Sequence, residues 1–390
     1  MDHQLMRHLG SVRYGGASVG ECLAAAAQIR DADPASWIET FAEAGRRQSE
    51  DAAMRADKGH AISARDQYLV ACNSYRAAEY YCPMDDPRRL EYGLASRQAF
   101  LGAMQWDEAA CAELWFSHEG LRLPAYHVRR ARSAGDRMLM IVSGFDGTLE
   151  ESYLAYGRPA LERGYDLLLF TGPGQMDTWR FNETSHFAPE FERVGRQAVD
   201  YALAQPGMDP RRLALMGISF GGYFASRIAA HEPRIRALVP NSPITDLHAY
   251  MTSFIGLDPA TLSESDDFSV ADLAHIPDTV MNAQTRAMSR NLMLRFGRPT
   301  FSRTYRRILD FRLSEDELAA IRCPSLALVG DGEGAEPLRQ WQVFQDAVGG
   351  RCTPRLFTAQ EGADAHCQVG NLSLSAAVAM DWLDETLQTI

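Results

Sequence analysis

The sequence predicts a doubly wound, mostly parallel α/β sheet that follows an N-terminal helical domain and is interrupted by a helical lid. After residue 108, short apolar runs alternate with helix-length segments over most of the chain. Such runs are typical of parallel strands that helices cover on both faces. Before that point, apolar side chains recur only at helical spacing. We therefore expect a helical domain at residues 1–107, a sheet domain at 108–390, and a lid within it at about 243–320.

Three amphipathic segments predict the helical domain. The clearest apolar face belongs to the second segment and consists of Ala64, Tyr68, Ala71, Cys72, Tyr75 and Ala78. The first and third segments are marked by Trp37, Phe41 and Ala44 and by Leu90, Leu94 and Leu101. Ser63 is expected to cap the second helix, because its hydroxyl can accept a hydrogen bond from a free amide in the first turn. Pro83 and Pro87 separate the second segment from the third.

The sheet is predicted to begin with a hairpin and to continue with parallel strands. The hairpin strands are expected at 112–117 and 121–129, and the later strands at 138–142, 166–170, 213–216, 237–240, 325–329 and 355–358. Helices are expected at 151–163, 189–205, 221–231, 337–348 and 373–388. The lid follows the strand at 237–240, where it would cover the active edge of the sheet. Extra helices packed aside would fit the same sequence equally well.

Charge and composition restrict the partners. The net charge is -12, and a field of that sign repels nucleic acid and anionic membrane surfaces. No apolar run reaches the ~18–20 residues of a membrane span, and the first residues lack the apolar stretch of a secretory signal. The seven cysteines are scattered without a C-x-x-C pair, which indicates reduced thiols in a cytoplasmic protein. We expect a small-molecule substrate, no metal and no cofactor. A homodimer through the helical domain stays open.

A serine stands between two glycines where an apolar strand turns into a helix. The stretch reads Gly217-Ile218-Ser219-Phe220-Gly221. Glycines two places before and after Ser219 remove the Cβ atoms that would clash in so tight a turn. The serine hydroxyl then projects above the sheet edge, at the positive end of the following helix. We therefore predict that Ser219 is a nucleophile, and a structural turn serine is the weaker interpretation.

A nucleophilic serine needs a base and an acid that orients the base. In this chain order the acid precedes the histidine. His366 is the only histidine beyond the last predicted strands and is the expected base. The acid should follow the strand at 325–329, where Glu333 and Asp331 both stand. Glu333 is favoured by its place three residues after a glycine, and Asp331 is the alternative.

The loop after the strand at 138–142 is expected to complete an oxyanion hole. It reads "SGFDGTLEE", and its glycines let backbone amides approach a ligand. The amides of Phe220 and Phe145 are the expected donors. Asp146, Glu150 and Glu151 stand beside them, and one of the three is a candidate acid or substrate contact. The alternative is that Glu150 and Glu151 only stabilise a helix N-terminus.

A pocket is expected between the sheet edge, the lid and the N-terminal helices. Trp179, Phe220 and Tyr223 are candidates for its lining, because large aromatic side chains commonly line such pockets. Packing in the core is an equally good interpretation of these three side chains.

On these residues the chain resembles the α/β-hydrolase superfamily, and more narrowly a group with an N-terminal helical domain. That group includes 2,6-dihydroxypseudooxynicotine hydrolase, bacterial esterases and hydrolases of polyketide pathways in secondary metabolism. The matching stretches are "GHAISARDQYLVACNSYRAAEYY" (59–81), "GFDGTLEE" (144–151), "GISFGG" (217–222) and "AHCQVGN" (365–371). The resemblance implies a triad of Ser219, His366 and an acid at 331–333. It also implies that a glutamate near the oxyanion loop assists carbon–carbon cleavage, with Glu150 the best match and Asp146 and Glu151 the alternatives.

The expected function is a serine hydrolase that cleaves an ester, thioester, lactone or activated ketone through an acyl-enzyme. A cyclase or lactonase would use the same triad and pass the acyl group to a nucleophile of the substrate itself. A binding protein on a hydrolase fold is a third and weaker hypothesis, because the chain offers candidates for every triad member.

Overall fold

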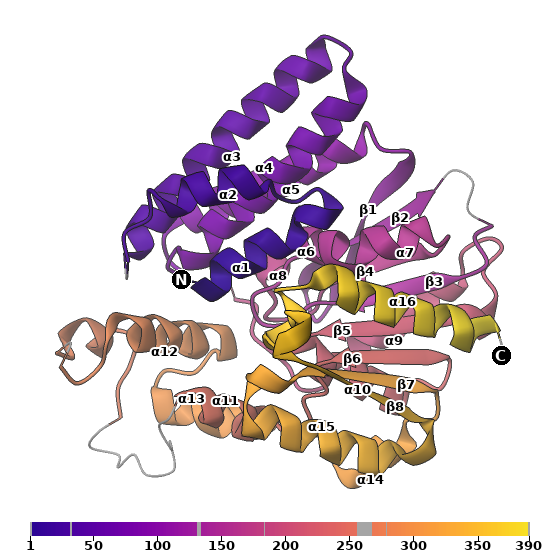
Figure 1. The fold of residues 1–390 in the computed structure, drawn as a ribbon. Helices are drawn as coiled ribbons and strands as arrows, with labels where there is room; N and C mark the ends of the chain where they lie inside the picture. Colours follow the sequence, from indigo (N-terminus) through magenta and orange to yellow (C-terminus); the bar gives the residue numbers. More distant parts are fainter. Residues whose placement is uncertain are drawn as a thin grey trace.

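An eight-stranded sheet forms the centre of the molecule (Figure 1). The computed structural model describes residues 2–31, 33–130, 134–182, 184–255, 267–277 and 279–388. The strand order is β1-β2-β4-β3-β5-β6-β7-β8. The strands are β1 (Ala109–His118), β2 (Leu121–Arg130), β3 (Met138–Val142), β4 (Asp166–Phe170), β5 (Leu213–Ile218), β6 (Ala237–Asn241), β7 (Ser325–Gly330) and β8 (Cys352–Phe357). The hairpin β1–β2 joins β4 antiparallel, and the remaining pairs are parallel, so the predicted fold class is confirmed.

Burial explains which strands the sequence locates best. All five residues of β3 and of β4 are buried, because helices cover both faces of the sheet there. Along β3, Met138, Met140 and Val142 face one core, and Leu139 and Ile141 face the other. β8 lies at the edge of the sheet with only Phe357 fully buried, and it carries Pro354. It begins at Cys352, earlier than the predicted residue 355, because its first half has no apolar run to identify it.

Helices cover the two faces of the sheet. α9 (Glu192–Leu203), α10 (Gly221–His231) and α15 (Ala335–Val348) contribute to one core, and α7 (Arg158–Glu162) and α16 (Leu372–Gln388) contribute to the other. Figure 1 shows α16 lying across one face of the strands. The second core also contains Leu69 and Phe100 from the N-terminal helices, so that region packs directly on the sheet.

Five α-helices precede the sheet in the described residues, and the apolar spacing predicts the last three of them. They are α1 (Asp2–Gly10), α2 (Val19–Ala26), α3 (Pro34–Asp57), α4 (Ala61–Tyr81) and α5 (Pro87–Met104). α3 and α5 each begin with proline after a capping aspartate, Asp33 or Asp86. The buried Trp37 of α3 donates a hydrogen bond to the carbonyl oxygen of Ala77 in α4 at 2.8 Å. Ser63 is not a cap, because α4 begins two residues earlier at Ala61.

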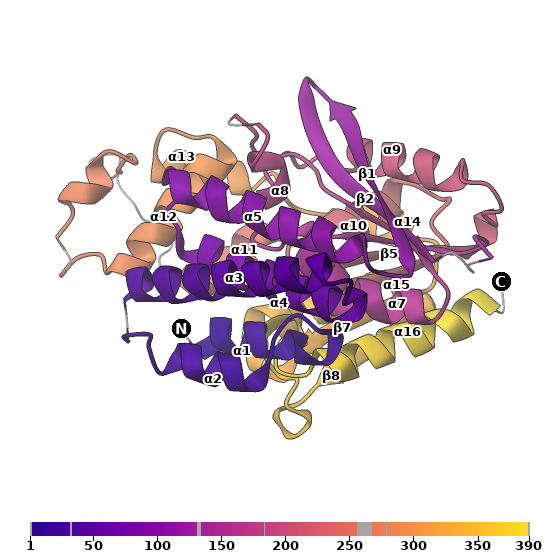
Figure 2. The same cartoon turned by 90° about the horizontal axis from the view of Figure 1, so that it is seen from above.

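An insertion of helices separates β6 from β7. It includes α11 (Leu247–Ile255), α12 (Ala283–Phe296), α13 (Phe301–Ile308) and α14 (Glu315–Ala320). The expected lid also takes in residues 256–266 and 278, which lie outside the described residues. Figures 1 and 2 show α12 and the N-terminal helices at the same end of the sheet. An ion pair between Arg290 of α12 and Asp85, just before α5, joins the two parts.

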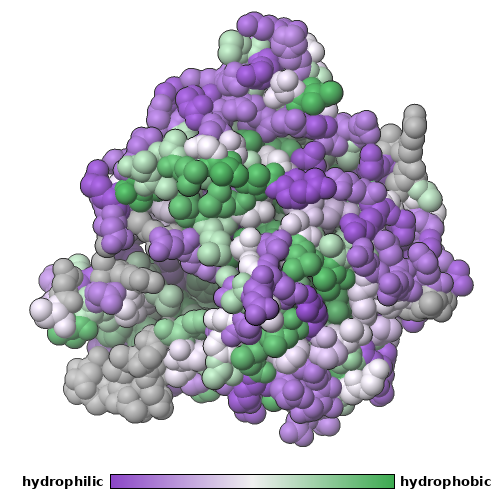
Figure 3. Space-filling view, in the orientation of Figure 1, coloured by the Kyte–Doolittle hydropathy of each residue, from purple (hydrophilic) through white to green (hydrophobic). Residues whose placement is uncertain are grey.

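The surface is recessed between the N-terminal helices and the lobe of α12 and α13 (Figure 3). Among the described residues, no helix is long and apolar enough to cross a membrane. Nor do the described ranges contain a group of three or more histidine, cysteine or acidic side chains arranged to hold a metal ion.

Candidate active site

The turn from β5 to α10 holds Ser219 in a left-handed conformation, with φ of 60°. Such a value is strained for a residue with a side chain. The neighbouring glycines permit the turn. A Cβ atom added to Gly217 would lie 2.0 Å from the carbonyl oxygen of Gly221, and one added to Gly222 would lie 1.8 Å from that of Ser242. The Ser219 amide donates to the carbonyl oxygen of Asn241 at 2.5 Å, which fixes the turn against β6.

His366 lies between Ser219 and Glu333. Its Nε2 atom is 2.9 Å from the Ser219 hydroxyl oxygen, and its Nδ1 atom is 2.6 Å from Oε2 of Glu333. The histidine loop reaches this position because it packs closely on the end of β7. A Cβ atom added to Gly330 would lie 2.1 Å from the carbonyl oxygen of Asp364. The structure therefore brings together the predicted serine, histidine and glutamate in one hydrogen-bonded chain.

Glu333 is held as a carboxylate by donors on several sides. Its side chain is 0% exposed. The Gly330 amide donates to Oε1 at 2.9 Å, and the Ser242 hydroxyl donates to Oε2 at 2.8 Å. Burial alone would raise the pKa of Glu333, but His366 and these donors outweigh it and lower the pKa. Asp331, the alternative acid, is exposed to solvent.

The imidazole of His366 has a raised pKa. Burial favours the neutral ring, but the neighbouring Cys367 sulfur and the Glu333 carboxylate favour the charged ring and raise the pKa well above 6.5. The hydroxyl of Tyr250, from α11, lies 3.2 Å from Nδ1 and 3.4 Å from Oε2 of Glu333. The His366 side chain is 27% exposed, so the ring is accessible beside Ser219.

The loop after β3 approaches the nucleophile turn at Gly144. A Cβ atom there would lie 2.8 Å from the Phe220 amide nitrogen and 2.8 Å from the Ser219 Cβ atom. The buried Gln175 donates to the carbonyl oxygen of Ser143 at 2.5 Å and, more weakly, to that of Gly144 at 3.4 Å. Because the N–H and C=O of a trans peptide point in opposite directions, a fixed Gly144 carbonyl also fixes the Phe145 amide. Both expected oxyanion donors thus belong to adjoining backbone segments.

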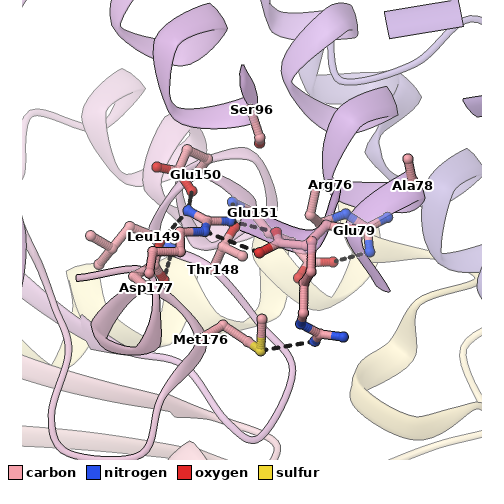
Figure 4. Close-up of polar contacts among 12 residues, drawn as sticks. Arg76, Ala78, Glu79, Ser96, Thr148, Leu149, Glu150, Glu151, Met176 and Asp177 are labelled. Atoms are coloured by element: carbon pink, nitrogen blue, oxygen red, sulfur yellow. Dashed lines mark hydrogen bonds and ion pairs between the residues drawn. The ribbon is translucent and has the colours of Figure 1, made fainter. Parts of the chain in front are cut away.

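The acidic residues of this loop lie in different surroundings. Glu150 is 0% exposed, accepts a hydrogen bond from Tyr126 at 2.8 Å, and lies 3.5 Å from Arg180. Figure 4 shows Glu150 and Glu151 beside Glu79 and Asp177. The protein encloses the Glu150 side chain in this structure, and its expected contact with the substrate stays a prediction. Glu151 pairs with Arg7 of α1 and lies 3.7 Å from Arg76 of α4.

The ion pairs of Glu151 fasten the N-terminal helices to the loop. Burial would raise the pKa of Glu151, but Arg7 and Arg76 lower it to about 2. Glu151 is therefore charged at neutral pH and holds both arginines beside α6 (Leu149–Ser152). Asp146, in contrast, is half-buried and forms no ion pair in the part of the chain that the structure describes. Its contact with substrate stays a prediction.

The three aromatic side chains that were candidates for the pocket lining differ in their burial. Tyr223 is 0% exposed, packs on Phe220 and Phe311, and donates to the carbonyl oxygen of Pro189 at 3.2 Å. It is a core residue, which agrees with the packing interpretation rather than with a place in the pocket lining. The ring of Phe220 is also buried, so only its backbone faces the serine turn. Trp179 is half-buried, and its expected contact with substrate stays a prediction.

Sequence reasoning missed several residues of the site. Ser242 and Tyr250 contact the carboxylate of Glu333, and Gln175 and Arg295 hold the oxyanion loop. These four residues come from separate loops and from the insertion, and no short motif contains them. A signal was available for two of them, since Ser242 directly follows β6, Gln175 lies in the loop after β4, and side chains at the carboxyl ends of parallel strands meet at one edge of the sheet. Tyr250 and Arg295 lie within helices of the insertion and carry no such signal.

Several known hydrolases resemble this chain in sequence. Residues 196–267, which include Ser219, match the model of the Prolyl oligopeptidase family (Peptidase_S9). The chain is 31% identical to Hydrolase LUC6 of Fusarium sp, with 98% of this chain and 95% of the relative covered. It is 30% identical to Alpha/beta hydrolase xenA of Xenoacremonium sinensis, with 86% of this chain and 82% of the relative covered.

A solved structure shows the same fold over almost the whole length. The 2,6-dihydroxy-pseudo-oxynicotine hydrolase has a TM-score of 0.75 and 18% identity to this chain, with 97% of this chain and 95% of that chain covered. The likeness includes the N-terminal helices and the insertion as well as the sheet. Since the sequence identity to named hydrolases extends over the same length, the chain belongs to the α/β-hydrolase family of enzymes.

Proposed function

We propose that this hydrolase is a serine enzyme that cleaves an ester, thioester, lactone or activated carbon–carbon bond through an acyl-enzyme. The observation that carries the proposal is the chain of hydrogen bonds from Glu333 through His366 to Ser219, with separations of 2.6 Å and 2.9 Å. A base and an orienting acid within this reach are what an activated serine requires.

The reaction would proceed in two steps. The Ser219 oxygen attacks the substrate carbonyl while Nε2 of His366 takes the hydroxyl proton, and the amides of Phe220 and Phe145 donate to the developing oxyanion. His366 then returns the proton to the leaving group, and the acyl group remains on Ser219. In the second step His366 takes a proton from water, the hydroxide oxygen bonds to the acyl carbon, and Ser219 leaves with the proton. Glu333 stays ionised and stabilises the imidazolium.

The covering elements support a substrate of small to medium size. We infer that the N-terminal helices and the helices α12 and α13 of the insertion form opposite walls of the recess in Figure 3. Asp146 lies close enough to Arg7 of α1, Tyr80 of α4 and Arg295 of α12 for its charge to act on all three. A free carboxylate at the meeting point of three elements is suited to accept a hydrogen bond from a polar group of the substrate.

Hydrolysis of 4-nitrophenyl esters of short acids tests the proposal. The wild-type protein should show a burst of nitrophenol that equals the enzyme concentration, followed by steady turnover. Ser219→Ala should abolish both phases. Ser226→Ala is the matched control, because the Ser226 hydroxyl is buried in α10 without a hydrogen-bond partner in the described structure. Turnover that survives in Ser219→Ala would overturn the proposal. Longer hydroxy esters distinguish hydrolysis from cyclisation. A product whose mass includes no added water would show that the acyl group passes from Ser219 to the hydroxyl of the substrate itself.

A further inference from the structure

Arg295 of α12 is fully buried beside the oxyanion loop. Its guanidinium donates to the carbonyl oxygen of Phe145 at 2.7 Å and to that of Gly174 at 2.6 Å, and it reaches the sulfur of Met176 at 3.1 Å. It also lies over the Phe145 ring, 4.6 Å from the ring centre. Within the described residues it forms no ion pair, so all its polar partners are backbone carbonyls and one thioether.

The end of α12 that carries Arg295 is anchored to the body of the enzyme. The carbonyl oxygen of Arg295 accepts a hydrogen bond from the Phe187 amide at 2.9 Å. The ring of His186 lies 3.1 Å from the Leu294 carbonyl oxygen through Nδ1. Gly297 ends the helix in a left-handed conformation, and a Cβ atom there would lie 2.4 Å from the His186 ring. These contacts fix the backbone that carries the guanidinium group.

A buried cation that makes no ion-pair contact is costly. Burial lowers the pKa of Arg295 to about 9, because the nearby Asp146 carboxylate, which acts in the opposite direction, only partly offsets it. An apolar side chain would fill the same space without that cost. The contacts that an apolar side chain could not make are the two hydrogen bonds to Phe145 and Gly174, and the planar guanidinium spans both carbonyls at once.

Gln175 and Arg295 together hold three successive carbonyls of the oxyanion loop. Gln175 contacts those of Ser143 and Gly144, and Arg295 contacts that of Phe145. The peptide planes on both sides of the Phe145 Cα atom are then fixed, and the direction of the Phe145 N–H with them. We propose that Arg295 is a positioning residue of the oxyanion hole, through which the insertion sets the geometry of catalysis. The inference rests on the proposed serine-hydrolase function.

The test compares Arg295→Gln and Arg295→Lys with the wild-type enzyme in the full chain. Arg286→Gln is the matched control. Arg286 lies on the same helix and donates to backbone carbonyls of the insertion itself, at Ile276 (2.9 Å) and Met281 (3.1 Å). Each variant is assayed for kcat and KM on a 4-nitrophenyl ester and on the corresponding O-aryl thionoester, whose sulfur is a weaker hydrogen-bond acceptor than oxygen. Thermal unfolding verifies that each variant is folded.

Arg295→Gln should lower kcat for the ester by about 10–100-fold, with KM changed by less than about threefold. A misplaced donor reduces the stabilisation of the transition state and leaves the binding of the substrate almost unchanged. In the same variant the ratio of the ester rate to the thionoester rate should fall. For Arg295→Lys, kcat and this ratio should lie between the values of the wild-type enzyme and of Arg295→Gln. Arg286→Gln should keep the wild-type ratio. Equal losses on both substrates, or the same loss in Arg286→Gln, would overturn the inference. A wild-type enzyme without Ser219-dependent hydrolysis would instead refute the proposed function.

Discussion

His366 places its Nε2 atom 2.9 Å from the hydroxyl oxygen of Ser219, although 147 positions separate the two residues in the chain. The distance depends on parallel strands that end at the same edge of the sheet. The serine turn follows β5, Glu333 follows β7, and the loop with His366 follows β8.

Replacement of Glu333 by Gln should lower kcat by about 10⁴-fold, because an amide favours the wrong tautomer of the histidine and leaves the imidazolium unpaired. Asp331→Asn should leave kcat within about twofold of the wild-type value, because Asp331 is exposed and Glu333 occupies the position on Nδ1. Steady-state hydrolysis of a 4-nitrophenyl ester measures both. The reverse order of the two losses would assign the acid to Asp331.

The pH dependence of kcat/KM should report His366. The ring must be neutral to accept the serine proton, and its pKa is raised well above 6.5. Activity should therefore rise with pH through a single ionisation above pH 6.5 and be lost below it. In Glu333→Gln the carboxylate that favours the charged ring is gone, so the ionisation should move to lower pH. A profile that stays in place in this variant would disconnect Glu333 from the histidine.

Gly222→Ala should destabilise the protein by roughly 3 kcal/mol or more, because the added methyl group would lie 1.8 Å from the Ser242 carbonyl oxygen. Gly20→Ala is the control. Gly20 lies in the helix α2 with no atom within 4 Å of the added methyl group, so alanine should raise stability there by about 0.5–1 kcal/mol. Unfolding in urea measures both changes. Equal effects would show that α10 can move away from β6.

Arg180→Met should be among the most destabilising single substitutions in the chain. Arg180 contacts Glu79 at 2.6 Å and Asp177 at 2.8 Å, and all three side chains are at most 3% exposed. Removing the cation leaves the buried Glu79 carboxylate without its partner, which costs about 3–5 kcal/mol. Arg46→Met should change the unfolding midpoint little, because the ion pairs of Arg46 are on the surface. Urea unfolding that does not distinguish the two variants would contradict a structural role for the buried cluster.

The serine turn and the positions of the buried strands along the chain could be predicted because each is a local pattern. Gly217 and Gly221 fix the turn, and continuous apolar runs mark the buried strands. The histidine was predictable by its place after the last strand, and Glu333 by its distance from a glycine. The edge strand β8 was located less well, since an exposed strand with a proline carries no such run.

The remainder of the site depends on contacts that no sequence period encodes. Glu150 was expected at the substrate because it follows the oxyanion loop, but the helix at Leu149–Ser152 turns its side chain toward Arg180. For Tyr223 the sequence left pocket lining and core packing open, and α10 turns the side chain into the core. Arg295 contacts Phe145 across 150 positions of sequence. Long-range packing of this kind appears only when the three-dimensional arrangement is known.

The nucleophilic role of Ser219 can be read from the mass of the protein during turnover. Wild-type enzyme is mixed with a 4-nitrophenyl ester, quenched in acid within the burst and digested for mass spectrometry. We expect one acyl group per chain on the peptide that contains Ser219, and no acyl group in Ser219→Ala, whose kcat should fall by about 10⁶-fold. An acyl group on another residue, or full turnover in Ser219→Ala, would show that the hydrogen-bonded chain to His366 is not the catalytic one.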